Sequence, residues 1–333
     1  MTERSPDELM PNEERLDQLR EEAWKKGVIA ERGVDVAGGP IPRKRGYYGQ
    51  PVLKPPVWTW EIPIYFFVGG LGGMSAVIAL GAVVFHHGSV ARAAMWMAGI
   101  AAVLSPVLLI LDLGRPRLFL NMLRVFKPQS AMSMGAWILT AFGVCVIPGL
   151  IALELHTHRF FGGTANEFLR MAAGLFVFGS AIFGLLLATY TGVLIGATVI
   201  PAWFLHRTLL PIHFGIAGLG SAAAALELLG HRIAPLNAIG FFAAGVELAL
   251  LVWLTLARHG AADRAIHEQT SGWLIRIGEI LTGPVPLVLR LFSLIPFAAI
   301  SFLIGALMSR MGWMAVGKIS GRDPEAVFAA ERY

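Results

Sequence analysis

The sequence predicts an all-α integral membrane protein, an eight-helix transmembrane bundle with a polar N-terminal extension. Two observations support this. Of the 333 residues, 56% are hydrophobic and 15% are charged, against about 45–50% apolar and about 25% charged in soluble domains. The 49 charged residues are also uneven, with 20 in residues 1–60 and 29 in the 273 that follow. The composition argues against a soluble enzyme and indicates a polar tail joined to a body embedded in a lipid bilayer.

The polar N-terminal extension, residues 1–57, is expected to hold one short helix and a connector. Asn12 can cap a helix over residues 12–26, in which acidic side chains come early and basic ones late. The stretch from there to Pro56 is rich in Gly and Pro and predicts an extended connector. Two interpretations of the helix stay open: it docks on a partner, or it is solvated.

The membrane body contains eight stretches of about 20 mainly apolar residues, the length that crosses about 30 Å of hydrocarbon. These predicted spans are 62–85, 92–112, 131–154, 169–200, 209–229, 236–257, 272–290 and 292–314. The fourth belongs to a run, 171–205, without Asp, Glu, Lys or Arg, so its helix must tilt or project beyond the bilayer. The seventh is the weakest, because it contains Arg276, Glu279, Arg290 and two prolines.

These spans divide into two groups. We expect residues 58–205 to form a four-helix bundle that holds the functional site, residues 206–318 a second bundle, and residues 319–333 a C-terminal tail. Small residues four positions apart let helices approach closely. Gly69 with Gly73, and Gly192 with Gly196, therefore predict close packing of the first and fourth spans.

Basic residues are distributed unequally between the two ends of the spans. Eleven Lys and Arg flank the helix ends on the N-terminal side, and four lie in the opposite loops. The positive-inside rule then predicts a multi-pass protein of a bacterial-type inner membrane with a cytoplasmic N-terminus. The excess of positive charge is thus attributed to topology, and no nucleic-acid partner is expected.

Antiparallel passage of the first four spans places several polar residues at one membrane face. Asp112 and Arg115 are three positions apart, so the arginine can keep the carboxylate ionised. A quinone that gains two electrons and two protons needs hydrogen-bond donors and a group that exchanges protons with water. Asp112 is the candidate for proton exchange, and Arg115 is the candidate that tunes it. Candidate contacts to the quinone are Tyr190, Glu61, Tyr65 and Ser133. The alternatives are a structural Asp112–Arg115 ion pair and an interfacial Tyr190.

Two carboxyl groups stand inside later spans. Glu227 and Glu247 are a possible proton relay, or else neutral structural hydrogen-bonding groups. A secondary transporter or proton pump without redox chemistry is therefore one alternative function. A haem-b anchor is another, although His213 is the only histidine clearly inside a span. The single Cys145 rules out a cysteine-ligated iron–sulfur cluster within this chain. No haem and no metal is expected.

Four segments resemble the NrfD/polysulfide reductase membrane-subunit (PsrC-like) family over about residues 55–325. They are TWEIPIYFFVGGLGG, LDLGRPRLFLNMLRVFKPQSAMSMGAW, LLLATYTGVLIG and SRMGWMAVGKISGRDP. The resemblance implies a membrane subunit of a quinone-linked oxidoreductase complex, without a redox cofactor of its own. It would exchange electrons between menaquinone or ubiquinone and a ferredoxin-like iron–sulfur subunit that serves a molybdopterin-type or related catalytic subunit. It also implies that Asp112, Arg115 and Tyr190 lie at the quinone site. The long extension and the amphipathic seventh span depart from the family pattern.

Overall fold

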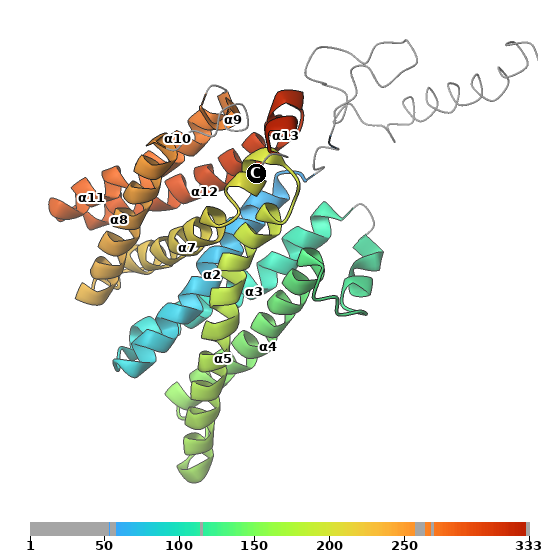
Figure 1. The fold of residues 1–333 in the computed structure, drawn as a ribbon. Coiled ribbons are helices and arrows are strands. Elements are labelled where there is room, and N and C mark those ends of the chain that lie inside the picture. The colour runs from blue at the N-terminus through green and yellow to red at the C-terminus, as the bar shows by residue number, and fades with distance from the viewer. Residues whose placement is uncertain (1–52, 54–57, 114–115, 257–263, 268–269, 331–333) are drawn as a thin grey trace, which may run out of the picture.

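The computed structural model describes residues 53, 58–113, 116–256, 264–267 and 270–330, and within them every regular element is a helix (Figure 1). This confirms the all-α class. The expected helix over residues 12–26, the connector after it and Arg115 lie outside the described residues. Seven of the described helices are long and apolar enough to span a membrane.

The first bundle consists of four long helices, each close to a predicted span. α2 packs against α3 and α5, and α4 packs against α3 and α5. A 3-10 helix, η3 (Pro116–Met122), follows α3 and leads toward α4. The four helices are α2 (Glu61–Val84), α3 (Gly88–Asp112), α4 (Ala131–Thr157) and α5 (Gly163–Gly196).

The second bundle contains three long helices and one interrupted one. Gly283 separates α10 (Thr270–Thr282) from α11 (Pro284–Leu291), and together these two cover the predicted span 272–290. The interruption has a local cause, because Pro284 lacks an N–H and disfavours a helical conformation in the residue before it. The expected seventh span is therefore two short helices, and the expected count of eight spanning helices is not confirmed. The long helices are α7 (Leu209–Leu228), α8 (Ala234–Leu256) and α12 (Ile295–Ser320).

Three short helices lie at the end of the molecule where α2 begins, which we call the upper face (Figure 1). They are α6 (Pro201–Leu205), α9 (Arg264–His267) and α13 (Pro324–Ala330). On α6, Trp203 stacks on Trp58 with ring centroids 5.7 Å apart, and its Nε1 donates to the Trp313 carbonyl at 2.8 Å. The upper face thereby ties the start of α2 to the end of α12.

The two glycine pairs predicted from sequence do allow close helix contacts. A Cβ on Gly73 would lie 2.3 Å from the Gly184 carbonyl oxygen, so α2 and α5 touch through their backbones. A Cβ on Gly192 would lie 2.4 Å from the backbone of Leu210, where α5 meets α7. The predicted close approach of these helices is confirmed.

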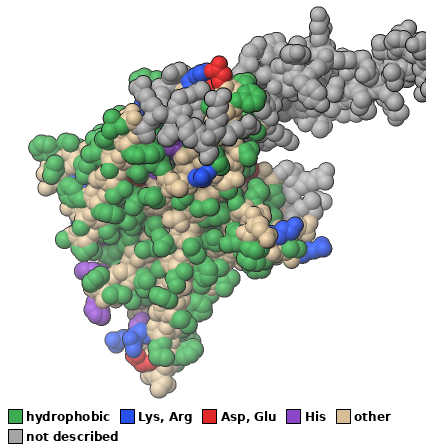
Figure 2. All heavy atoms as spheres, viewed as in Figure 1, with side chains coloured by type: hydrophobic (Ala, Val, Ile, Leu, Met, Phe, Trp, Pro, Cys, Tyr) green, Lys and Arg blue, Asp and Glu red, His purple; other side chains and the backbone are tan. Residues whose placement is uncertain are grey.

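The distribution of apolar and charged side chains on the outer surface is the one expected in a lipid bilayer. Apolar side chains cover the flank of the bundle in Figure 2, while the charged residues in that view gather toward its two ends. The 34 residues of α5 correspond to about 51 Å at 1.5 Å per residue. That exceeds the hydrocarbon thickness of about 30 Å, so α5 projects beyond the core, as its sequence predicts.

Candidate functional site

A cavity of about 350 Å³ lies inside the first bundle near the upper face. Helices α2, α3, α4 and α5 and the η3 segment all contribute to its wall. Most of the wall is apolar, with Ile62, Phe66, Leu109, Phe119, Met132 and Leu139 among its residues. The polar side chains on the wall are Asp112, Tyr65, Tyr190 and Thr140, with the indole of Trp58 beside them. Three residues predicted as a site from sequence therefore meet at one cavity.

Asp112 is the last residue of α3, and residues just before α2 hold its carboxylate. Its Oδ1 accepts hydrogen bonds from the backbone N–H of Thr59 at 3.2 Å and from the Thr59 hydroxyl at 3.0 Å. The Thr59 hydroxyl also contacts the carboxylate of Glu61, so Glu61 joins the same group. Of this group only Asp112 lines the cavity wall, so Glu61 does not contact the cavity directly, contrary to the prediction from its sequence position.

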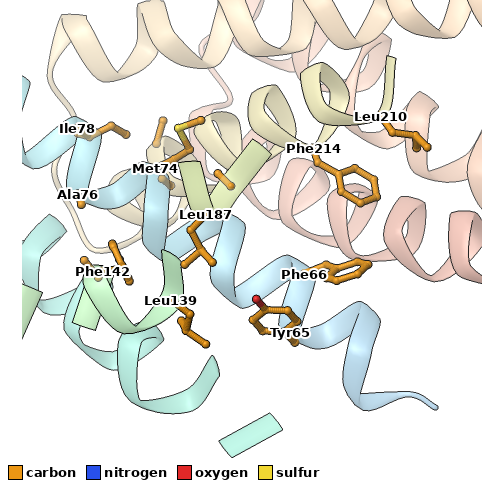
Figure 3. Packing of buried hydrophobic residues seen from close by; sticks show 14 of the residues in the cluster. Tyr65, Phe66, Met74, Ala76, Ile78, Leu139, Phe142, Leu187, Leu210 and Phe214 are labelled. Carbon is orange, nitrogen blue, oxygen red and sulfur yellow. The ribbon is translucent and has the colours of Figure 1, made fainter. Parts of the chain in front are cut away.

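The two tyrosines reach the cavity from different helices. Figure 3 shows Tyr65 on α2 between Phe66 and Leu139 of α4. From α5, Tyr190 donates its phenol hydrogen to the carbonyl oxygen of Ala131. Its ring fills the space beside Gly135, where an added Cβ would lie 2.2 Å from the ring. The absence of a side chain at Gly135 thus permits Tyr190 to stand against the first turn of α4.

Ser133, like Glu61, is outside the cavity wall. Its hydroxyl donates to the Val125 carbonyl at 3.3 Å and accepts from the Lys127 N–H at 3.0 Å, so it fixes the loop before α4. Sequence reasoning missed Thr59 and Trp58. The signal was available, since both precede the first span on the same face as Asp112.

Comparison with known proteins bears on this geometry. Residues 51–318 match the family described as polysulphide reductase, NrfD. The chain belongs to the NrfD family. Members are membrane subunits of polysulfide-reductase-like oxidoreductase complexes and usually associate with other redox subunits. No curated protein matches the chain. The matched region of this NrfD chain includes the whole cavity wall and nearly all of both bundles.

The second bundle of the NrfD chain contains a buried ion pair. Arg290 of α11 donates to both carboxylate oxygens of Glu227 on α7, at 2.7 and 2.6 Å, and to Asn237 Oδ1 at 2.7 Å. The Arg290 and Glu227 side chains are 0% and 1% exposed. This bidentate pair satisfies the Glu227 carboxylate locally.

Glu247 belongs to a separate buried cluster. His213 Nδ1 lies 2.9 Å from Glu247 Oε2, and His213 Nε2 lies 2.9 Å from Ser309 Oγ. Ser309 donates to Glu279 Oε1 at 3.2 Å, and that oxygen is 3.4 Å from His213 Nε2. Four helices, α7, α8, α10 and α12, therefore bring one histidine and two carboxyl groups together. Both nitrogens of His213 face partners in the bundle, which is not the arrangement of an axial haem ligand.

Proposed function

We propose that the chain is the quinone-reactive membrane anchor of a respiratory oxidoreductase complex. In this proposal it exchanges electrons between menaquinone or ubiquinone and a docked ferredoxin-like iron–sulfur subunit, which serves a molybdopterin-type or related catalytic subunit. The observation that carries the proposal is the cavity where Asp112, Tyr65 and Tyr190 converge between apolar walls. Family membership supports the setting, a membrane subunit of a redox complex.

The cavity has the composition that a quinone head group and its tail need. Its volume of about 350 Å³ falls within the range of about 300–1,000 Å³ typical of small-molecule sites. The apolar wall suits an isoprenoid chain, and the Tyr65 hydroxyl can donate to a quinone carbonyl oxygen, whereas the Tyr190 hydroxyl hydrogen is donated to the Ala131 carbonyl. Asp112 lies at the end of α3 near the interface, where a carboxylate can exchange protons with water. Thr59 keeps this carboxylate oriented through two hydrogen bonds.

The partner is proposed to dock on the loop beside the cavity. Leu120, Val125 and Phe126 are more than half exposed there, and Arg124 and Lys127 are exposed next to them. Exposed apolar residues flanked by charges are typical of protein interaction sites. Because the chain has one cysteine, an iron–sulfur cluster held by cysteines has to belong to the partner, and a partner docked on this loop would bring its cluster near the cavity.

Replacing Asp112 with asparagine tests the proposed function in the assembled complex. Asp112→Asn preserves side-chain size but removes the proton-exchanging group. We expect quinone-linked turnover to fall about 10²-fold or more, the usual effect of losing a general acid or base. Activity of the catalytic subunit with an artificial electron-transfer dye should stay unchanged.

The matched control is Glu167→Gln, at an exposed carboxylate paired with Arg170 near the start of α5, at the opposite end of the molecule. This variant should keep both activities. Equal quinone-linked turnover in Asp112→Asn and the parent complex would refute the proposed role of Asp112.

A further inference from the structure

The hydrogen-bond directions in the cluster around His213 require a proton between His213 and Glu247. Ser309 donates its one hydroxyl hydrogen to Glu279 Oε1. The hydrogen in the 2.9 Å contact between Ser309 Oγ and His213 Nε2 therefore belongs to the ring nitrogen. The other ring nitrogen, Nδ1, faces Glu247 Oε2 at 2.9 Å. A nitrogen and an oxygen at this distance need one hydrogen between them, on either atom, because two lone pairs would repel.

The charge balance of the cluster also indicates one additional proton. The guanidinium of Arg310 interacts electrostatically with both Glu247 and Glu279 and is 1% exposed. With both carboxylates ionised and His213 neutral, the cluster would carry a net charge of one minus. Since unbalanced buried charge costs several kcal/mol, one additional proton is needed to make the group neutral.

From these two arguments we infer that His213, Glu247 and Glu279 form a buried proton-binding site that holds one exchangeable proton, with Ser309 and Arg310 as positioning residues. The ligand atoms of the three residues lie within 4.8 Å of one another. Glu247 and Glu279 also interact with each other through their buried carboxyl groups. The carboxyl groups and the imidazole together offer the proton alternative positions inside the site. The inference does not depend on the quinone cavity.

A metal ion fits the cluster less well than a proton does. His and carboxylate groups are common ligands of divalent cations, but the buried Arg310 already contributes one positive charge near the two carboxyl groups. A divalent ion would leave a net charge of one plus in a buried site, and His213 would have to give up a hydrogen bond to coordinate it. The proton satisfies both the charge and the hydrogen bonds.

The helix interruption lies next to this site. Gly283 donates its N–H to the Glu279 carbonyl oxygen at 2.8 Å. A Cβ on Gly283 would lie 3.0 Å from the backbone nitrogen of Leu248, the residue after Glu247. The break between α10 and α11 thus seats the two carboxyl-bearing helices against each other. Interrupted helices in membrane proteins occur where the backbone is covered by protein or lines a functional site.

Infrared difference spectroscopy of the purified full-length chain tests the site. Raising the pH should withdraw the shared proton, so the alkaline-minus-neutral spectrum should lose one carboxylic acid or imidazolium band that shifts in D₂O. Glu247→Gln should abolish this signal and still fold, because Arg310 then balances Glu279 alone. Glu279→Gln, the second variant, should also abolish the signal, because Arg310 then balances Glu247 alone. Glu167→Gln, at an exposed carboxylate, should retain the signal.

Three results would overturn the inference. The band could persist in both Glu247→Gln and Glu279→Gln. The band could disappear from the parent on adding Na⁺ at constant pH, which would make the site a sodium site. The purified chain could contain one divalent metal per molecule by elemental analysis. An intact band in the parent and the control, lost in the two variants, supports the proton site.

Discussion

At the scale of single residues, charged side chains are held in place by hydrogen bonds from residues that are distant in the sequence. Asp112 is held by Thr59, which is 53 residues away in sequence, and Glu227 is held by Arg290, 63 residues away. The consequence differs with environment. The Asp112 side chain lies at a cavity wall, where the proposed function has it exchange a proton, whereas the pair of Glu227 and Arg290 is buried and joins α7 to α11.

Filling the cavity should impair quinone access without unfolding the chain. Gly143 lies on the cavity wall, and a Cβ there would have no neighbour within 4 Å, so Gly143→Leu adds bulk only to the empty space. We expect quinone-linked turnover to fall at least about tenfold, since a loss of about 1.4 kcal/mol of binding free energy weakens affinity by this factor. The measurement is a quinone titration of the assembled complex.

Gly174→Leu is the matched control, because Gly174 also has no neighbour within 4 Å but is not part of the wall. It should behave like the parent. An unchanged quinone titration in Gly143→Leu would contradict the assignment of the cavity.

At the scale of helices, the first bundle depends on backbone contact between α2 and α5. Gly73→Leu should separate these helices, because even a Cβ would overlap the Gly184 carbonyl at 2.3 Å. Overpacking of this kind costs about 1–3 kcal/mol, and we expect the upper end of that range. Thermal unfolding of the chain in detergent measures the loss. Gly81→Leu, on the same helix with no neighbour within 4 Å, should leave the transition unchanged, and equal loss in both variants would argue against the contact.

Hydropathy predicted which segments are helices better than where they begin. The fourth span was placed at 169–200, whereas α5 covers Gly163–Gly196. Its polar first turns lie beyond the hydrocarbon, where apolar content carries no information about helix structure. The span 272–290 looked weak because Glu279 and Arg290 are charged. Their partners belong to other helices, and single-segment hydropathy cannot register such pairing.

The same limit applies to the sites. The shared face of Tyr65, Asp112 and Tyr190 was predictable, because antiparallel passage alone sets the depth of each residue. The partners of His213 could not be identified from the sequence, since Glu247 is 34 residues away on α8 and Glu279 lies on α10. Depth follows from counting residues, but which helix faces which requires the packing itself.

At the scale of the whole molecule, the two ends of the bundle should face different compartments. In a Cys145→Ser background, Glu325→Cys would place a thiol on α13 at the upper face, and Glu167→Cys one near the start of α5 at the other end (Figure 1). The positive-inside prediction puts the upper face in the cytoplasm. A membrane-impermeant maleimide should therefore label the Glu167→Cys variant, but not Glu325→Cys, in intact spheroplasts.

Reversed labelling would show that the upper face points outward and would contradict the cytoplasmic N-terminus. Labelling of both thiols from one side would contradict the membrane-spanning arrangement of α5 and α12.

The buried charges of the second bundle also constrain how the protein is made. Glu227 and Glu247 emerge from the ribosome before Glu279, Arg290 and Arg310, which complete their ion pair and their cluster. A charged residue at the centre of a lone helix costs about 2.5–3.5 kcal/mol during insertion. Helices α7 and α8 should therefore stay at the insertion machinery, or bound to a chaperone, until α10 to α12 are inserted. A chain truncated after α8 would present unpaired acids to lipid, and quality-control proteases should degrade it.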